Sequence, residues 1–315
     1  MTLKERYKAL KKFLKEDIWD VQIENLGRIK RKMVLYLQAL IVTMRTFSKQ
    51  KIGYQSVALS FFCTMATVPL IAVIFSISGG LGIAERLREL LYANFPNSSE
   101  VIESVLQYAD NMLETAASST LGLISFLIFF WLILWMMIQV EKVFNNVWNV
   151  SMSRKLWERT LVYFILIVLS PFVALILFSG PVTYSHILSF FGVNTPQVGM
   201  FNNILGWIFF WVLSSLIISV MYKFIPCCKV RYIHALVSAA IAGFAFTILQ
   251  YFYLETQIFI TRLSAVYGTV AAVPLFMFWL NFSWFIILFG CELCYAYQSV
   301  KALNDNKAET NGKQE

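Results

Sequence analysis

Five long stretches of the sequence contain no charged residue, and they constrain the fold more than any other feature. They cover residues 52–84, 115–140, 160–222, 232–254 and 263–291. A helix needs about 20 mostly apolar residues to cross the roughly 30 Å hydrocarbon core of a bilayer. Only 14% of the residues are charged and 58% are hydrophobic, more apolar surface than a soluble domain could bury. The chain is therefore expected in a membrane.

The longest of these stretches is divided in two. Gly180 and Pro181 close its first half, and the turn residues 192–197 precede the second. The sequence therefore predicts an all-α fold, a polytopic six-transmembrane-helix bundle, because lipid offers the backbone no hydrogen-bond partners outside a helix. The predicted spans are residues 55–79, 120–140, 160–180, 203–222, 234–255 and 268–294.

The positions of Lys and Arg predict the orientation. With the N- and C-termini both in the cytoplasm, 23 of the 26 basic residues lie inside and three outside, which fits the positive-inside tendency. Residues 1–50 would then form basic amphipathic cytoplasmic or interfacial helices, and residues 51–298 the bundle. Residues 80–119 would form an acidic outside loop with short helices, and residues 299–315 a disordered polar cytoplasmic tail.

Two apolar stripes at helical spacing precede the first span. One lies within residues 1–24 and the other comprises Met33, Leu37, Leu40, Met44 and Phe47. Basic amphipathic helices suit the anionic cytoplasmic surface of a membrane, and they equally suit packing against the protein's own cytoplasmic loops. Nucleic acid is not an expected partner, because the positive-inside topology explains the net charge of +8 and no RNA-recognition signature is present.

The sequence offers little for catalysis or metal binding. The two histidines, His186 and His234, are predicted to lie on opposite faces of the membrane. Cys291 and Cys294 form a lone C-x-x-C, whereas a structural zinc site normally has four ligands. No Walker A, zinc-protease or nucleophile-elbow motif occurs. We therefore expect no cofactor, no metal site and no catalytic residue, and the prediction is that the protein is not an enzyme.

Polar side chains within the spans are the candidates for a functional site, because lipid makes them costly. Glu141 and Glu292 lie near the predicted cytoplasmic ends of the second and sixth spans. Each is a candidate to face a cavity or to pair with Lys142, Lys223 or Arg231, and each could instead be solvated at the interface. Gln139, Gln250 and Asn281 lie deeper. Asn281, near the middle of the sixth span, is expected to hydrogen-bond another helix.

Three prolines fall within the predicted spans, at positions 69, 171 and 274. Each frees a backbone carbonyl and can kink its helix. Kinked helices line cavities in transporters, although many kinks only accommodate packing. Both interpretations of these prolines stay open.

Four stretches of the sequence resemble the YihY/BrkB family of membrane proteins. Residues 267–274, continuing through Trp279 to residues 290–293, resemble the family's last span. Residues 56–62 with Pro69 resemble its first span, residues 145–150 its Asn-x-x-Trp element, and residues 229–235 its basic turn into the fifth span. Cys291 and Thr269 depart from the Ala and Ser usual in the family. The positions that match family motifs are Pro69, Asn145, Trp148, Tyr267, Gly268, Trp279, Gly290 and Glu292.

The resemblance implies a multi-pass protein of the bacterial cytoplasmic (inner) membrane, linked to lipid and envelope biology. It predicts a transporter or flippase-like protein for a lipid or envelope precursor, with membrane lipids as partners. The alternative is a non-catalytic scaffold in envelope maintenance that binds envelope proteins or forms a homo-oligomer. A membrane-embedded enzyme ranks third, and the ribonuclease label once attached to the family finds no paired acids or metal cluster in this sequence.

Overall fold

The computed structural model describes residues 19, 27–80, 82, 84–94, 102–104, 106–107, 110–111, 120–151, 163, 199–263 and 265–311. Within these ranges the chain forms helices and short connections, and no described residue lies in a strand. The all-α prediction is therefore confirmed for this part of the chain. The helices are α2 (Arg28–Lys49), α3 (Ile52–Gly80), α4 (Ala84–Asn94), α6 (Thr120–Val147), α8 (Gly199–Phe224), α9 (Tyr232–Leu263) and α10 (Ala265–Asn311).

Five of these helices lie where spans were predicted. Helices α3, α6, α8, α9 and α10 cover the first, second, fourth, fifth and sixth predicted spans. Three segments are long and apolar enough to cross a membrane, namely Ile204–Phe224, Tyr232–Thr256 and Val273–Asp305. The third predicted span, residues 160–180, lies almost wholly outside the described residues. The six-span count therefore stays a prediction.

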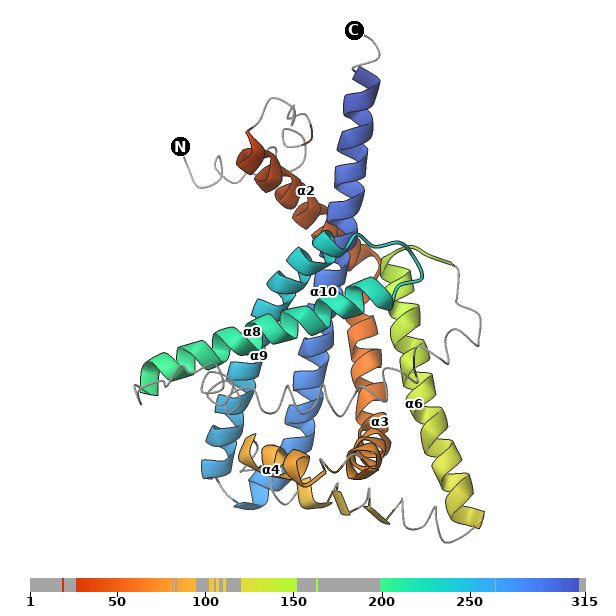
Figure 1. The fold of residues 1–315 in the computed structure, drawn as a ribbon, viewed down its shortest axis with the longest axis vertical. Helices are drawn as coiled ribbons and strands as arrows, with labels where there is room; N and C mark the ends of the chain where they lie inside the picture. The colour runs from red at the N-terminus through yellow and green to blue at the C-terminus, as the bar shows by residue number, and fades with distance from the viewer. Residues whose placement is uncertain are drawn as a thin grey trace.

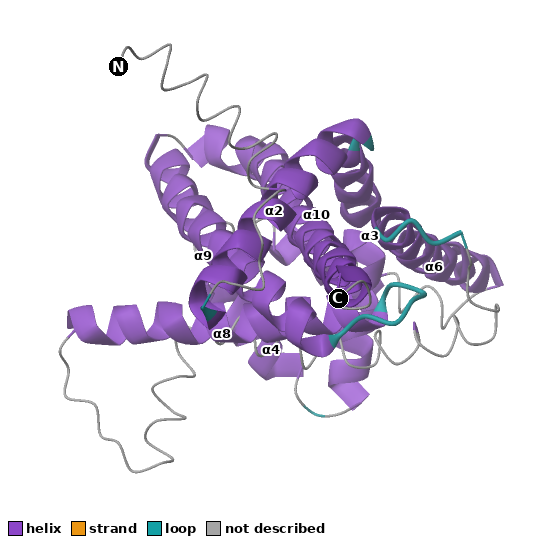
Figure 2. Ribbon diagram, turned by 90° about the horizontal axis from the view of Figure 1, so that it is seen from above, coloured by secondary structure: helices purple, strands orange, loops and turns teal. Residues whose placement is uncertain are grey.

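Helix α10 is the central element of the fold. It is 47 residues long, about 70 Å at the rise of an α-helix. It contacts α2, α3, α6, α8 and α9, and it stands among them when the molecule is seen from above (Figures 1 and 2). Helices α3, α6 and α9 run beside it, whereas α8 crosses the bundle at a large angle (Figure 1). Side chains that α10 presents on different faces therefore meet different helices.

Two close helix crossings depend on glycine. A Cβ atom on Gly290 of α10 would lie 2.3 Å from the Tyr222 hydroxyl oxygen and 2.7 Å from the Ala242 Cβ atom. A Cβ atom on Gly243 of α9 would lie 2.3 Å from the Ser215 hydroxyl oxygen and 3.1 Å from the Ser215 backbone. Small residues allow helices in a membrane to approach closely in this way. These positions bring α8, α9 and α10 together.

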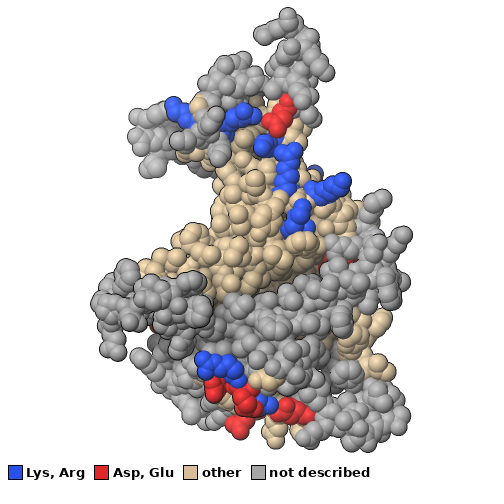
Figure 3. Space-filling model, in the orientation of Figure 1, with Lys and Arg blue, Asp and Glu red and all other residues tan. Residues whose placement is uncertain are grey.

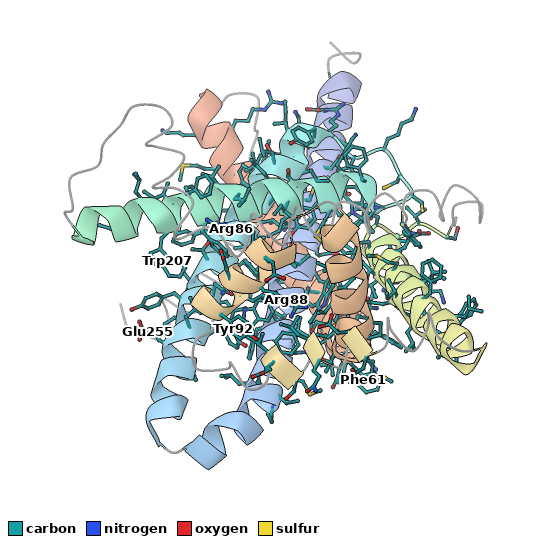
Figure 4. All side chains as sticks on the ribbon, turned by 60° about the horizontal axis from the view of Figure 1, so that its bottom comes forward. Phe61, Arg86, Arg88, Tyr92, Trp207 and Glu255 are labelled. Atoms are coloured by element: carbon teal, nitrogen blue, oxygen red, sulfur yellow. The ribbon has the colours of Figure 1, made fainter. Side chains whose placement is uncertain are left out.

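Charged side chains gather at the two ends of the described structure (Figure 3). Lys and Arg predominate at the end formed by α2 and the C-terminal part of α10. Acidic residues lie at the opposite end, near α4, where Arg88 pairs with Asp110 at 3.0 Å. Arg86, Arg88 and Tyr92 of α4 are seen at this end in Figure 4. Which end faces the cytoplasm stays a prediction.

The C-terminal tail corrects one prediction. We expected disorder from residue 299, but α10 continues as a helix to Asn311. The extension is held by contacts with α2, which the local sequence does not reveal. Val300 is buried against α2, the Asn304 amide donates to the Gln38 side-chain oxygen at 3.3 Å, and Asp305 pairs with Arg31 at 3.3 Å. The prediction was wrong because these partners lie more than 260 residues away in the chain.

Candidate functional site

Glu292 is the most unusual side chain of the described structure. It lies on α10 and is 0% exposed. Neither of its carboxylate oxygens has a hydrogen-bond partner among the described residues. Burying a carboxylate without a partner is costly, so such a group is expected where function requires it. The sequence-based choice of Glu292 as a candidate thus falls on a buried polar group that the described structure leaves unsatisfied.

The neighbours of Glu292 on α10 show where its side chain faces. Residues three or four apart share a helix face, so Phe289 and Tyr295 flank Glu292 on either side. Phe289 packs edge-on against Phe47 of α2, with 5.5 Å between ring centroids. The Tyr295 hydroxyl accepts a hydrogen bond of 3.2 Å from Asn149, which follows α6. Glu292 therefore faces the region between α2 and the end of α6.

Asn281 lies on the same face of α10. It is eleven residues before Glu292, which is three helical turns or about 16 Å. Its side-chain nitrogen is buried and has no hydrogen-bond partner among the described residues. The expected hydrogen bond from Asn281 to another helix is therefore not seen within the described structure. One helix face carries two unsatisfied polar groups at different depths.

An open pocket of about 250 Å³ continues this face toward the basic end of the molecule. Tyr295 and Ser299, one and two turns beyond Glu292, contribute to its wall. Lys229 supplies a positive charge and no acidic residue contributes to the lining. The other lining residues are Trp148, Cys228, Gln298 and Ala302. The pocket is suited to an anionic or zwitterionic group that approaches from this end.

The end of α6 shapes one side of the pocket. Asn149 adopts a left-handed conformation with φ of 51°, which asparagine tolerates better than most residues. The Val150 amide donates to the Asn145 carbonyl at 2.9 Å, and the Asn149 amide donates to the Asn146 carbonyl at 3.1 Å. This pair of bonds is a Schellman motif, which stops a helix. The motif-matching Asn-Asn-Val-Trp-Asn stretch thus ends α6 and turns Trp148 to the pocket.

Trp148 and Gln298 hold the remaining walls. The Trp148 ring packs edge-on against Tyr295, with 5.5 Å between centroids. The Gln298 side chain accepts from the Arg231 amide at 3.2 Å and donates to the Lys229 carbonyl at 3.4 Å. These contacts fix the turn between α8 and α9 against α10. The pocket is therefore assembled from three separate segments of the chain.

Glu141 has a different environment at the same end of the bundle. It is 1% exposed and lies on α6. The Tyr163 hydroxyl donates to one carboxylate oxygen, and the Cys227 thiol lies 3.7 Å from the other. One turn further along α6, the Asn145 side-chain oxygen accepts from the Cys227 amide at 2.8 Å. Glu141 and Asn145 therefore tie α6 to the turn after α8.

Two further polar candidates differ in what they do. The Trp279 indole donates to the Gln250 side-chain oxygen at 3.0 Å, which joins α10 to α9. Gln139 is half-buried on α6. Gln250 therefore serves helix packing rather than the polar face that carries Glu292.

The other motif-matching positions are partly explained. Gly290 lies at the close crossing with Tyr222 of α8 and Ala242 of α9, on the side of α10 opposite Glu292. Pro69 is buried within α3, and Pro274 is exposed within α10. Tyr267 and Gly268 belong to α10, and their side-chain surroundings lie outside the described structure, as does Pro171.

The Cys228 thiol at the pocket is expected to be less reactive than an ordinary exposed thiol. Burial raises the pKa of the Cys228 thiol, the neighbouring Cys227 raises it further, and Lys223 lowers it. A raised pKa leaves less of the reactive thiolate at neutral pH. Within the described residues, no group of three or more His, Cys, Asp or Glu side chains is placed to hold a metal ion.

Some residues of the site were not singled out by sequence reasoning. Tyr222 is fully buried and donates to the Ile287 carbonyl at 2.7 Å, joining α8 to α10. Cys227 and Tyr163 surround Glu141. No local pattern marks these contacts, because each joins segments 22 to 86 residues apart. Of these contacts, only the one at Tyr222 has a local signal in the sequence, because the helices that cross there carry small residues, Gly290 on α10 and Ala242 on α9.

The fold and the site define an all-helical membrane protein with an unsatisfied polar face on its central helix. The family model for virulence factor BrkB matches residues 43–314, which is most of the chain. The chain therefore belongs to the virulence factor BrkB family, and the resemblance drawn from its motifs is confirmed. No solved structure matches it.

Three relatives illustrate the match. The chain is 29% identical over 273 residues to a UPF0761 membrane protein of Chromohalobacter salexigens, which covers 84% of this chain and 64% of that protein. It is 28% identical over 246 residues to one of Actinobacillus pleuropneumoniae, covering 74% and 83%. It is 23% identical over 258 residues to one of Haemophilus influenzae, covering 79% and 91%. The chain thus spans less than two thirds of the Chromohalobacter protein and more of the other two.

Proposed function

We propose that this protein is a transporter or flippase-like protein that moves a lipid or envelope precursor across the bacterial cytoplasmic membrane. The observation that carries the proposal is Glu292, a fully buried carboxylate without a described partner. It lies on the same face of α10 as Asn281 and the open pocket. Polar groups within a membrane protein are expensive and commonly mark the path of a polar substrate.

The arrangement suits a substrate with a polar head and an apolar tail. At about 250 Å³ the pocket is smaller than typical ligand pockets of roughly 300–1,000 Å³, so it fits a head group better than a whole lipid. Lys229 and Gln298 offer a charge and hydrogen bonds there. Glu292 and Asn281 offer polar contacts further along the face, while an acyl chain stays in the surrounding lipid. Both termini in the cytoplasm and a bacterial inner-membrane location complete this proposal.

A lipid-translocation assay tests the function. The full-length protein is reconstituted in vesicles that contain a fluorescent phospholipid, and an impermeant reductant bleaches the outer leaflet. We expect faster loss of the inner-leaflet signal with wild-type protein than in empty vesicles. Glu292→Gln should reduce the protein-dependent rate at least tenfold. Equal rates with and without wild-type protein would overturn the proposal.

The matched control is Glu255→Gln. Glu255 is exposed on α9 (Figure 4), 23 residues beyond the start of the helix, which is the end that adjoins the pocket residue Lys229. This variant makes the same chemical change without touching the polar face of α10. It should therefore keep the wild-type rate, and a loss equal to that of Glu292→Gln would show that the effect is not specific to the site.

The alternative function is a scaffold that binds envelope proteins or a second copy of the chain. The observation that favours it is the acidic end, where Glu85 and Glu89 of α4 are exposed. The double substitution of Glu85 and Glu89 to Gln should abolish a scaffold function and leave lipid translocation unchanged. Asn281→Ala should reduce lipid translocation and leave a scaffold function intact.

A further inference from the structure

Helix α2 has two faces with different partners. One face carries Leu35, Gln38, Ala39 and Thr43, all of which are buried. Leu35 and Ala39 pack in one cluster with Leu293, Ala296, Tyr297 and Val300 of α10. This face attaches α2 to the rest of the protein.

The other face is apolar and exposed. It carries four of the five stripe residues identified in the sequence. Their exposed fractions are 61% for Met33, 42% for Leu37, 39% for Leu40 and 63% for Met44. The spacing of these residues places them along one side of the helix. Phe47, the last member of the stripe, packs instead against Phe285 and Phe289. Among the described residues, then, the protein's own loops do not cover this stripe.

The position of α2 along α10 relates the stripe to the bilayer. Near its N-terminus, Arg31 pairs with Asp305 in the polar extension of α10. Near its C-terminus, Phe47 contacts Phe285 and Phe289, in the apolar part of α10. These contacts are 16 to 20 residues apart on α10, roughly 24–30 Å along its axis. Helix α2 therefore descends along α10 from its polar extension to its apolar part, at an oblique angle to α10 (Figure 1). Met44 lies nearer the membrane-spanning region than Met33.

The charge of α2 indicates what kind of surface its exposed stripe fits. The helix contains six basic residues and no acidic one. Lys30, Arg31, Arg45 and Lys49 are among them. Basic side chains gather at the end of the molecule that α2 and the C-terminal part of α10 form (Figure 3). An apolar stripe bordered by basic residues fits an anionic lipid surface, where each cation near the head groups contributes about 1 kcal/mol.

We propose that α2 is an oblique membrane anchor seated in the leaflet at the basic end of the protein. Its exposed stripe lies among the acyl chains, with Met44 deepest and Met33 shallowest, and its basic residues contact anionic head groups. The opposite face of α2 holds the part of α10 next to Glu292. The anchor thus connects the charge of the leaflet to the helix that carries the polar face. This inference stands apart from lipid translocation and does not require it.

Lipid-depth quenching of the full-length protein tests the anchor. Single cysteines replace Met33, Leu37 or Met44 in a background that lacks the five native cysteines and keeps the wild-type melting temperature. Each carries an environment-sensitive fluorophore in nanodiscs that contain spin-labelled lipid. Lys49→Cys is the control, because Lys49 is exposed on a different side of α2 five residues after Met44, where position along the inclined helix alone would place it at least as deep as Met44.

We expect the Met44 probe to be quenched at least threefold more than the Lys49 probe. The order should be Met44, Leu37 and then Met33. Adding about 30% anionic lipid should increase quenching at Met33 at least twofold, and 0.5 M salt should reverse that increase because it screens the head-group charges. Equal quenching of the stripe and control probes would overturn the proposal.

Two other occupants of the stripe give distinct results, and each would also overturn the proposal. If a second copy of the chain covers it, the Met44 cysteines of two copies should cross-link and lipid quenching should be absent. If residues 1–26 cover it, lipid quenching should appear only after those residues are deleted.

Discussion

Two buried carboxylates at the same end of this protein have opposite surroundings. Glu141 on α6 receives a hydrogen bond from Tyr163 and lies beside the Cys227 thiol. Glu292 on α10 is as fully buried, yet neither oxygen has a described partner. Burial alone therefore does not distinguish a structural acid from a functional candidate. The partners do.

The difference follows from what each helix face meets. The Glu141 side of α6 meets the Cys227 thiol, in the turn after α8, and the Tyr163 hydroxyl, which comes from a different segment. The Glu292 face of α10 has aromatic and small residues on either side, Phe289 and Ala296 among them. A buried acid that is well hydrogen-bonded holds elements together, whereas one without partners adds no such bond. We therefore expect these two residues to separate stability from function.

The largest expected effect tests the packing of α10 on the side opposite Glu292. Gly290→Leu would place side-chain atoms where Tyr222 and Ala242 already lie, on the opposite side of α10. The Ala242 Cβ atom cannot rotate out of the way, and overpacking of this kind costs about 1–3 kcal/mol or more, so we expect little folded protein or a large fall in melting temperature. Yield and thermal unfolding of the purified protein measure it.

Gly27→Leu is the control for that substitution. Nothing lies within 4 Å of a Cβ atom added at Gly27, and the residue precedes α2 in a φ of −56° that any residue adopts. This variant should unfold at the wild-type temperature. A Gly290→Leu protein as stable as Gly27→Leu would show that the crossing of α8, α9 and α10 is not as described.

The second effect compares the two acids directly. Glu141→Leu should lower stability by about 2–4 kcal/mol, because it removes the buried hydrogen bond between the Tyr163 hydroxyl and the Glu141 carboxylate. Glu292→Leu should change stability by less than about 1 kcal/mol, or increase it, because no described hydrogen bond is lost and an apolar side chain replaces a buried polar one. Unfolding in a fixed detergent, with the two variants in parallel, measures both. Equal destabilisation would remove the distinction between the two sites.

Several helices were predictable because their signal is local. Runs without charge and about 20 residues long determine where an apolar helix can lie, and α8, α9 and α10 fall on those runs. Glu292 and Asn281 could be selected for the same reason, since polar residues are conspicuous within apolar runs. The family could be recognised from short motifs at the ends of spans. None of these inferences requires knowledge of tertiary contacts.

What could not be predicted depends on partners far away in sequence. Polar composition indicated disorder after residue 299, but Gln38 and Arg31 of α2 support a helix there. The stripe on α2 was readable, yet the face that packs against the protein is the other one. Glu141 gave no sign that Tyr163 and Cys227 surround it. In each case the deciding contact joins segments that the chain brings together only on folding.

The smallest expected effect uses the two adjacent cysteines that border these regions. Cys227 belongs to the Glu141 cluster, whereas Cys228 lines the pocket on the Glu292 side. Burial raises the pKa of Cys228, so less thiolate is present at pH 8 than for an ordinary exposed thiol. A protein whose single cysteine is Cys228 should therefore react with iodoacetamide several-fold more slowly at pH 8 than one whose single cysteine replaces exposed Ser48.

The pH dependence separates ionisation from access. Because the Cys228 pKa is raised, its alkylation rate should still be rising at a pH where the rate at position 48 has levelled off. Restricted access alone would lower the Cys228 rate by the same factor at every pH. Lys223→Gln should shift the Cys228 profile to still higher pH, because the ammonium group lowers the Cys228 pKa. Parallel profiles at the two positions would mean that the pocket wall is no less hydrated than the surface of α2, and Cys228 would then not report on a separate environment beside Glu292.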